Sequence, residues 1–333
     1  MTPEDRFVEA LQRFLPDCAG VWVGPGDDAA VVAPRPGSLA ATTDLLVEGI
    51  DFLPTEEPER LGRRALAVNL SDLAAVGARP EFFLLSIAFP RQRGDDYALG
   101  IVRGAISQAM RFGTCLVGGD LSRAPSVVIS VALWGQPAGK PLLRSGARPG
   151  DEIWLSGQPG RAAAGLRLAQ QVSSGNPSWP SSFSEGASQL LAAYRDPDPR
   201  IGLGLWLAAH GTASAAIDVS DGLGMDAGRL ARASGVRAVL ERDEIPIHPA
   251  LATFAEIESV DPFEWILSGG DDYELLFTAP PEARPALNEV HPEWEYSVTR
   301  VGHIEAGEGA VLRDRTGDRE ISHLGYDHFE EAR

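Results

Sequence analysis

Apolar and polar residues alternate with two different periods along the first 140 residues of the chain. Short apolar runs, typical of strands, occupy residues 29–33, 39–47, 82–89, 115–119 and 126–135. Longer stretches rich in Ala, Leu and Arg, typical of helices, occupy residues 57–77 and 95–112. Strands and helices that alternate in this way predict an α/β unit.

A second unit is predicted beyond a stretch rich in Gly, Pro and Arg at residues 141–149, which has the composition of a linker. Apolar runs begin again at Glu152, and residues 223–234 are predicted to form a helix. Residues 173–186 have the composition of an exposed loop. We therefore expect two domains, residues 1–140 and 150–333.

Composition narrows the class of protein. Of 333 residues, 44% are hydrophobic and 23% charged, as in soluble globular proteins. The net charge of −18 argues against nucleic-acid binding, and no apolar run approaches the roughly 20 residues of a membrane span. The acidic N-terminus, with Thr2 and Pro3 placed to begin a helix, is unlike a signal peptide.

The cysteines and the lysine limit the chemistry further. The only two cysteines, Cys18 and Cys115, are expected to form no disulfide framework, which favours a cytoplasmic location, and Cys115 is expected to be unreactive. The single lysine, Lys140, lies in GQPAGKP, where the glycine spacing and the following proline do not fit a P-loop. If the protein handles nucleotide phosphates, it must use metal ions, backbone N–H groups and arginine.

Acidic residues recur where apolar strand runs end and within apolar helices. They are Asp27, Asp28, Asp44, Asp72, Asp120, Asp218, Asp221, Asp271 and Asp272. Two carboxylates about 4 Å apart repel by roughly 4 kcal/mol at an effective dielectric near 20, so a converging set needs cations. With the hydroxyls of Thr42 and Thr43 they form a set of hard oxygen donors, which suits Mg²⁺ rather than zinc.

Each of these residues also has an ordinary structural interpretation. Asp72 is surrounded by apolar residues, yet with Asn69 and Ser71 it also fits the exposed stripe of an amphipathic helix. Ser220 and Asp221 precede the predicted helix at 223–234, whose N-terminal N–H groups suit phosphate, although either residue also fits a helix cap.

Eight segments, read in order, give the chain a resemblance to a known family. They are GPGDDAAVV, TTDLLVEGIDF, NLSDLAAVGARP, LVGGDLS, LLRSGARPGDEIWLSG, AIDVSDGL, SGGDDYELLF and GYDHF. Together they resemble the thiamine-monophosphate kinases of the PurM-like superfamily, which includes aminoimidazole ribonucleotide synthetase. The resemblance implies a two-domain α/β fold, with an N-terminal mixed sheet that carries helices on one face and forms a homodimer.

The resemblance also implies an activity and a set of site residues. The family transfers the γ-phosphoryl group of ATP to thiamine monophosphate, using several Mg²⁺ ions. Catalytic positions correspond to Asp44, Asp72, Asp120 and Asp218. Metal positions correspond to Asp27, Asp28, Thr42, Thr43, Asp44, Asp72, Asp120, Asp218 and Asp221. Nucleotide positions correspond to Gly119, Asp120, Arg144 and Ser220, and substrate positions to Asp51, Asp271, Asp272 and Tyr326.

Three substrate positions depart from the family pattern, with Asp51 in place of His, Asp271 in place of Glu and Tyr326 in place of Trp. Because the acceptor is already a phosphate, direct in-line transfer needs no strong base. Two alternatives stay open, namely another ATP-using enzyme of the superfamily and a non-catalytic binder of Mg²⁺ or nucleotide. Selenophosphate- and hydrogenase-maturation-type enzymes use a cysteine at a chain end, and the ends MTPEDRF and DHFEEAR hold none.

Overall fold

The computed structural model describes residues 10–25, 29–33, 37–289 and 294–327. The described residues form two compact units. The first unit holds those up to Leu73 together with Ala78–Pro137, and the second holds Ala74–Gly77 and those from Ala138 onward. The domain boundaries expected from the sequence stay a prediction. The N-terminal helix expected at Thr2 and the pair Asp27 and Asp28 lie outside the described residues.

The first unit contains a small hairpin and a four-stranded sheet. The hairpin strands are β1 (Val21–Val23) and β2 (Val31–Val32), which pair antiparallel. The sheet strands are β3 (Ala40–Val47), β4 (Ala78–Phe89), β5 (Cys115–Arg123) and β6 (Val128–Pro137). Their order is β3-β6-β4-β5, and β4 and β5 run parallel while the other neighbours run antiparallel, so the expected mixed sheet is confirmed.

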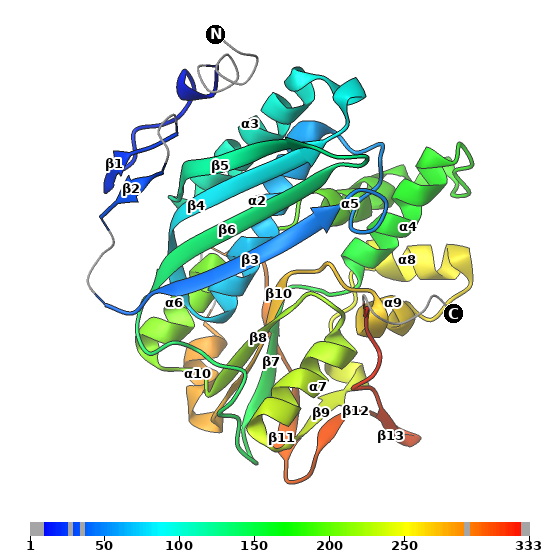
Figure 1. Cartoon of the computed structure of the whole chain (residues 1–333). Helices are drawn as coiled ribbons and strands as arrows, with labels where there is room; N and C mark the ends of the chain where they lie inside the picture. Colours follow the sequence, from blue (N-terminus) through cyan, green and yellow to red (C-terminus); the bar gives the residue numbers. More distant parts are fainter. Residues whose placement is uncertain (1–9, 26–28, 34–36, 290–293, 328–333) are drawn as a thin grey trace. The chain divides into compact units, whose positions relative to one another are not determined.

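Two long helices lie on one face of this sheet (Figure 1), α2 (Pro58–Ala75) and α3 (Asp95–Phe112), with the short 3₁₀ helix η1 (Arg91–Arg93) before α3. Their backbones approach so closely that a Cβ on Gly104 would lie 1.8 Å from the carbonyl oxygen of Glu59, which only glycine permits. Burial alternates along β6, where Val131 is buried and Ser130 is half-buried. The sheet therefore has one face against helices and one more open face.

The two cysteines of the first unit form a disulfide, contrary to the expectation from the sequence. The bond joins Cys18, which precedes β1, to Cys115, the first residue of β5, and the Cα atoms lie 6.1 Å apart. It closes a sequence separation of 97 residues. A cysteine count alone does not reveal such a pairing, because the partners meet only when the N-terminal segment folds beside β5.

The second unit is built on a seven-stranded mixed sheet. Its strands are β7 (Glu152–Ser156), β8 (Ala215–Val219), β9 (Arg237–Glu241), β10 (Glu274–Ala279), β11 (Val298–Glu305), β12 (Gly309–Asp314) and β13 (Gly317–Glu320). Their order is β13-β12-β9-β11-β7-β10-β8, with β9 and β12 parallel. All residues of β7, β8 and β10 are buried, so this end of the sheet is covered on both faces.

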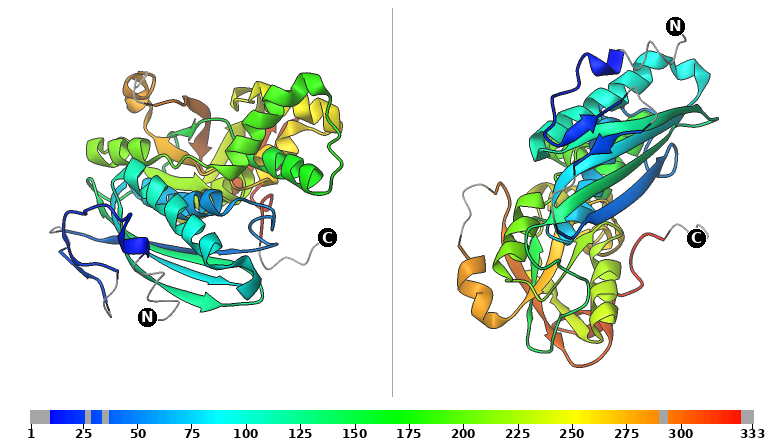
Figure 2. Two further views of the ribbon diagram at one scale, coloured as in Figure 1. Left: turned by 90° about the horizontal axis from the view of Figure 1, so that it is seen from above. Right: turned by 60° about the vertical axis from the view of Figure 1, so that its left-hand side comes forward.

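Helices surround this sheet (Figure 1 and Figure 2). They are α4 (Arg161–Ser173), α5 (Ser184–Arg195), α6 (Ile201–His210), α7 (Leu223–Ser234), α8 (Pro249–Glu258), α9 (Pro262–Ser268) and α10 (Arg284–Leu287). Short 3₁₀ helices are η2 (Ser181–Phe183), η3 (Arg242–Glu244) and η4 (Pro281–Ala283). Helix α7 packs against β8 and β12, which fixes the turn that leads into it.

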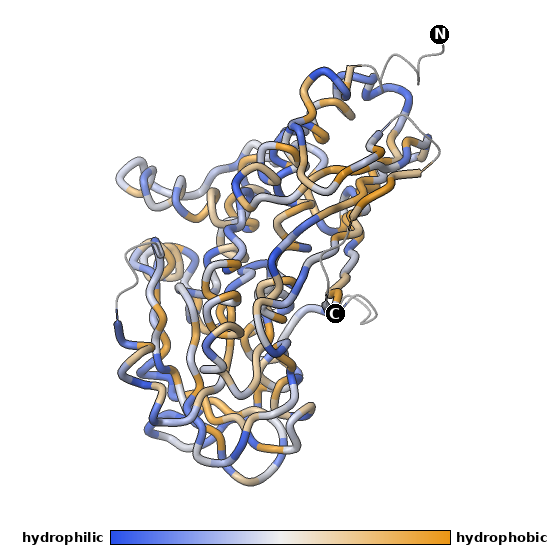
Figure 3. The backbone as a smooth tube through the Cα atoms, turned by 90° about the vertical axis from the view of Figure 1, so that its left-hand side faces the viewer, coloured by the Kyte–Doolittle hydropathy of each residue, from blue (hydrophilic) through white to orange (hydrophobic). Residues whose placement is uncertain are grey.

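Hydrophobic and hydrophilic stretches alternate along the backbone of both units (Figure 3), as expected for elements that bury one side. In the second unit the core includes Leu155 on β7, Ile217 on β8 and Phe254 on α8. Among the residues that the structure describes, no helix has the length and hydrophobicity that crossing a bilayer requires.

Candidate active site

In the first unit, the fold brings together Thr42 on β3 and Asp72 on α2. The Thr42 hydroxyl donates a hydrogen bond of 2.5 Å to Oδ2 of Asp72. Both side chains are half-buried. Asp44 lies two residues after Thr42 on the same strand, so it faces the same side of the sheet. Thus the sheet and α2 place two carboxylates and one hydroxyl, all hard oxygen donors, on the helix-covered face.

Thr43 lies on the opposite side of β3, since side chains alternate along a strand. Its hydroxyl donates to the carbonyl oxygen of Val131 on the neighbouring strand β6, at 2.8 Å. The hydroxyl is therefore engaged within the sheet, unlike that of Thr42.

Asp120 reaches the open face of the sheet because of a bulge in β5. The register shifts between Phe83 and Leu84, so that Gly119 pairs with Leu85 and Asp120 with Ser86. Without the extra residue, Asp120 would pair with Ile87 and face the helices as Asp44 does. A Cβ on Gly119 would lie 1.8 Å from the Leu85 carbonyl oxygen, so the bulged backbone requires glycine there.

Asp51, the expected substrate residue of the first unit, shapes the turn that follows β3. Its Oδ2 accepts a hydrogen bond of 2.7 Å from the amide of Val47. Its carbonyl oxygen accepts a weak contact from Nη2 of Arg64 at 3.4 Å. The carboxylate thus closes a local turn. A His side chain at this position would make a different hydrogen bond to the turn.

In the second unit, one turn gathers expected site residues from three parts of the chain. Asp218 is buried on β8, and Ser220 and Asp221 follow it. The Ser220 carbonyl accepts from the amide of Asp271 at 2.7 Å, and the Asp221 carbonyl accepts from the amide of Tyr326 at 2.8 Å. Backbone hydrogen bonds therefore hold these segments together, although they are far apart in the sequence.

The loop that carries Asp271 has an uncommon backbone. Gly270, Asp271 and Tyr273 have φ values of 64°, 63° and 52°, so two residues with side chains adopt the left-handed region. The Tyr273 hydroxyl donates to Oδ1 of Asp271 at 2.9 Å. Strained backbone of this kind is concentrated at functional sites, where the surrounding structure enforces it.

Asp226 on α7 is a central residue of this turn that sequence reasoning missed. Its side chain is fully buried, and its Oδ2 accepts from the amides of Ser220 and Asp221 at 3.1 and 3.0 Å. Burial, and next the charge of Asp221, raise the pKa of Asp226 to about 6. Arg229 donates from Nη1 to Oδ1 of Asp226 at 2.7 Å and to Oδ2 of Asp221. An acid flanked by Met225 and Ala227 was the available signal.

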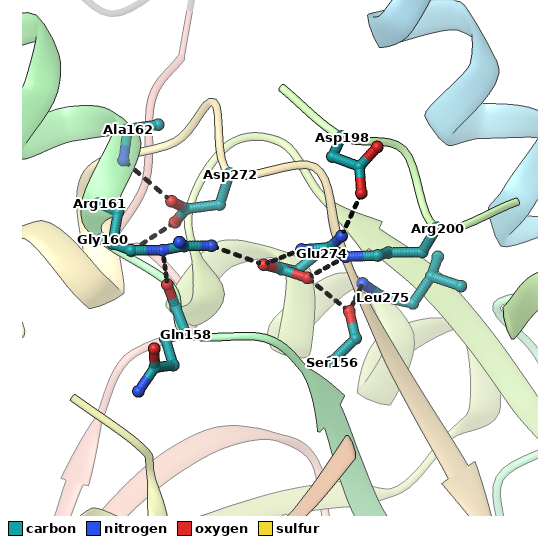
Figure 4. A network of polar contacts seen from close by, with 10 residues as sticks. All are labelled: Ser156, Gln158, Gly160, Arg161, Ala162, Asp198, Arg200, Asp272, Glu274 and Leu275. Atoms are coloured by element: carbon teal, nitrogen blue, oxygen red, sulfur yellow. Dashed lines mark hydrogen bonds and ion pairs between the residues drawn. The ribbon is translucent and has the colours of Figure 1, made fainter. Parts of the chain in front are cut away.

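Asp272 caps the start of α4 (Figure 4). Its carboxylate accepts from the amides of Gly160 and Ala162 at 2.6 and 3.2 Å. Burial of the carboxyl group raises the pKa of Asp272 to about 7, while the two amides act in the opposite direction. Both carboxylate oxygens of Asp272 thus accept from backbone amides within the fold.

Beside Asp272, a buried ion pair joins Glu274 on β10 to Arg200 at the start of α6 (Figure 4). Arg200 donates from Nε and Nη2 to the two carboxylate oxygens at 2.6 and 2.7 Å. Burial alone would lower the pKa of Arg200, but Glu274 outweighs it and raises that pKa. Ser156 also donates to Glu274 at 2.6 Å. A glutamate inside the apolar run ELLF was the signal that sequence reasoning left unused.

Comparison with known proteins identifies the relatives of this chain. Residues 26–136 match the family model of the AIR synthase related protein N-terminal domain, and residues 148–315 match that of the C-terminal domain. A thiamine-monophosphate kinase of Salmonella typhimurium is 38% identical over 316 residues, which cover 93% of this chain and 92% of the relative. The chain belongs to the thiamine-monophosphate kinase family.

Solved structures agree with this family. The thiamine-monophosphate kinase of Stenotrophomonas maltophilia is 37% identical, with a TM-score of 0.81 over 92% of this chain and 94% of that chain. A structure of AaThiL complexed with AMPPCP and TMP is 30% identical, with a TM-score of 0.78 over 98% and 96% of the two chains. The expected PurM-like two-domain fold of this thiamine-monophosphate kinase family is therefore confirmed.

The positions of the carboxylates decide whether this member of the thiamine-monophosphate kinase family has a preformed metal site. Within residues 10–25, 29–33, 37–289 and 294–327, no three His, Cys, Asp or Glu side chains come together as a ready-made metal centre. Asp27 and Asp28 lie outside the described residues. Mg²⁺ is usually held by one or two carboxylates plus waters and substrate phosphates, so separate small sets of donors suit it.

Proposed function

We propose that this chain transfers the γ-phosphoryl group of ATP to thiamine monophosphate, producing thiamine diphosphate and ADP. The main support is membership of the thiamine-monophosphate kinase family over most of the chain. The AaThiL structure contains AMPPCP, a non-hydrolysable analogue of ATP, together with TMP, which we interpret as thiamine monophosphate. This pair of ligands corresponds to a phosphoryl donor and an acceptor bound by one protein.

The oxygen donors of the candidate residues are of the kind that Mg²⁺ prefers. Candidate ligands are Asp27, Asp28, Thr42, Thr43, Asp44, Asp72, Asp120, Asp218 and Asp221. Of these, the Thr42–Asp72 pair is the most distinct, because a hydroxyl and a carboxylate meet at 2.5 Å. Bound Mg²⁺ would neutralise the phosphates of donor and acceptor, which otherwise repel each other. We assign the catalytic roles to Asp44, Asp72, Asp120 and Asp218, all as carboxylates that position charge rather than abstract a proton.

Nucleotide and substrate contacts are assigned in a similar way. Gly119, Asp120, Arg144 and Ser220 are the nucleotide candidates, and the exposed side chain of Arg144 is accessible to a phosphate. The substrate candidates are Asp51, Asp271, Asp272 and Tyr326, and the carboxylate of Asp272 also accepts from the amides of Gly160 and Ala162. A carboxylate such as Asp51 suits the positive charge of a thiazolium ring.

We also propose a homodimer formed through the open face of the four-stranded sheet. Leu45 on this face has 56% of its surface exposed, and Ala132 and Trp134 of β6 are only half-buried. Light scattering should give twice the 35.5 kDa of one chain, and Leu45→Arg should give 35.5 kDa. A wild-type mass of one chain would contradict the dimer.

The same proposal locates the chain in the cytoplasm, where ATP is available. The Cys18–Cys115 disulfide is compatible with that location only as a reversible bond, since cytoplasmic thiols are kept reduced. Rapid alkylation of thiols in intact cells, followed by mass spectrometry, would show whether the two cysteines are reduced there.

A coupled ADP-release assay tests the proposed activity. ATP and MgCl₂ are supplied with thiamine monophosphate, with thiamine or with no acceptor, and each reaction is repeated with excess EDTA. We expect ADP only with thiamine monophosphate and MgCl₂ together. ADP release with thiamine would indicate a different kinase, and its absence from every reaction would indicate a non-catalytic binder.

A further inference from the structure

Arg229 on α7 connects two carboxylates of different character. Its Nη1 donates to Oδ2 of Asp221, whose side chain is 26% exposed, and to Oδ1 of Asp226, whose side chain is fully buried. One guanidinium nitrogen therefore bridges the exposed acid of the turn to a buried acid of the helix. The three groups carry a net charge of −1 when both acids are ionised.

Asp226 makes this arrangement rigid. While one of its oxygens receives Arg229, the other receives the amides of Ser220 and Asp221 at 3.1 and 3.0 Å. The backbone of the turn and the side chain of Asp221 are thus both attached to the Asp226–Arg229 pair. Since Asp226 is fully buried within α7, it gives the pair a fixed anchor.

We propose that Arg229 is a positioning residue that keeps Asp221 from binding a free divalent cation and so favours a cation that arrives with nucleotide. This inference rests on the proposed function, in which Asp221 is a cation ligand. A free Mg²⁺ ion that approaches Asp221 meets a guanidinium already paired with one carboxylate oxygen, and the two cations repel. A Mg²⁺ ion already bound to polyphosphate carries compensating negative charge, so the same guanidinium opposes it less.

The affinity for cations distinguishes this role of Arg229 from a purely structural one. An arginine that only stabilises the turn would affect folding stability and leave the affinity for cations unchanged. An arginine that competes for Asp221 lowers the affinity of Asp221 for a free cation, and it lowers that affinity more when the charge of the cation is not compensated by bound phosphate. Arg232 lies three residues further along α7 and is exposed, so it provides a matched arginine outside the bridge.

Calorimetric titration with MgCl₂ alone, without nucleotide, tests the proposal in the full-length protein. Arg229→Ala should bind Mg²⁺ about tenfold more tightly than wild type, which corresponds to about 1.4 kcal/mol. Arg232→Ala should change the affinity less than about twofold, because an exposed charge at a distance is screened. Arg229→Lys, which keeps the charge, should remain close to wild type.

A double-mutant cycle assigns the effect to Asp221. In an Asp221→Asn background, Arg229→Ala should produce no gain in Mg²⁺ affinity, since the freed carboxylate is absent. If Arg229→Ala does not fold, as judged by its thermal melt, Arg229→Gln takes its place with the same expectation. A gain equal to that of Arg232→Ala, or one that persists in the Asp221→Asn background, would overturn the proposal.

The same titration with MgCl₂ and ADP should show a smaller difference between Arg229→Ala and wild type than MgCl₂ alone. An equal difference would contradict the preference for nucleotide-bound cation. Failure of the proposed kinase activity would be seen separately, as wild-type protein that forms no thiamine diphosphate, because the cation titrations do not depend on turnover.

Discussion

Thr42 and Asp72 are thirty residues apart in the chain and meet through a hydrogen bond of 2.5 Å between hydroxyl and carboxylate. The contact links β3 to α2 on the face of the sheet that the helices cover. It resolves the two interpretations of Asp72 that the sequence left open, since the side chain is half-buried against a strand rather than part of a solvated stripe.

Asp72→Asn should lower kcat by more than about 100-fold, because an amide is a poor ligand for Mg²⁺ while its oxygen can still accept from Thr42. Circular dichroism and thermal melting should remain close to wild type. Asp96→Asn, the same change at an exposed position of α3, is the control and should keep full activity. Activity near wild type in Asp72→Asn would remove Asp72 from the metal ligands.

Arg144→Ala should raise the KM for ATP by roughly tenfold, since a lost charge-assisted phosphate contact is worth about 1.5–3 kcal/mol. The change in KM is measured at saturating thiamine monophosphate. Arg148→Ala, in the same exposed segment, should leave the KM unchanged. An unaltered KM in Arg144→Ala would leave Arg144 as a surface arginine of that segment.

Glu274→Gln should reduce the free energy of unfolding by about 3–5 kcal/mol, because it removes the buried counter-charge of the Arg200 guanidinium and leaves it only the exposed Asp198. Urea denaturation gives the measurement. Glu282→Gln, at an exposed position, should stay within about 0.5 kcal/mol of wild type. A loss below about 1 kcal/mol for Glu274→Gln would show that this ion pair contributes little net stability.

Asp272→Asn should change how stability depends on pH. Since burial raises the pKa of Asp272 to about 7, the folded protein holds this proton over a range in which the unfolded chain has lost it. In wild type, titration of Asp272 therefore lowers the free energy of unfolding as pH rises from about 4 to about 7. Asn does not titrate, so the variant lacks this change. The stability deficit of the variant, from urea curves at several pH values, should be largest near pH 4 and shrink toward pH 7. A deficit that is constant with pH would contradict the raised pKa.

Reduction of the Cys18–Cys115 disulfide should lower the free energy of unfolding by about 2–4 kcal/mol, because the bond closes a separation of 97 residues in the unfolded chain. Urea curves with and without a phosphine reductant provide the test. Cys18→Ser should match reduced wild type and be insensitive to the reductant. Identical curves for oxidised and reduced wild type would show that the bond contributes no stability.

Secondary structure was largely predictable from the sequence. Helices α3 and α7 cover the expected residues 95–112 and 223–234, because their apolar periodicity is regular and a glycine follows each one. Strand β5 was underestimated, since it continues beyond Gly119, where the expected run ends, through Asp120 to Arg123. Glycine and aspartate weaken the local preference for strand, and pairing with β4 overrides it.

The sequence predicted which types of residue form the candidate site, but it did not predict which residues contact one another there. Asp44 and Asp120 looked equivalent in the sequence, yet one bulge in β5 moves Asp120 to the open face of the sheet. Glu274 and Arg200 are 74 residues apart, and their pairing depends on how α6 begins beside β10. Local patterns identify which groups need a partner, whereas the identity of the partner is set by tertiary packing.

The central claim is that this chain phosphorylates thiamine monophosphate at its existing phosphate. Phosphorus NMR of a reaction with ATP, MgCl₂ and thiamine monophosphate tests it most directly, because a diphosphate differs in chemical shift and coupling from a monophosphate. The account predicts that thiamine diphosphate and ADP accumulate in equal amounts with wild-type protein and that Asp72→Asn produces neither at a comparable rate. ADP that accumulates beside inorganic phosphate, with thiamine monophosphate unchanged, would contradict it.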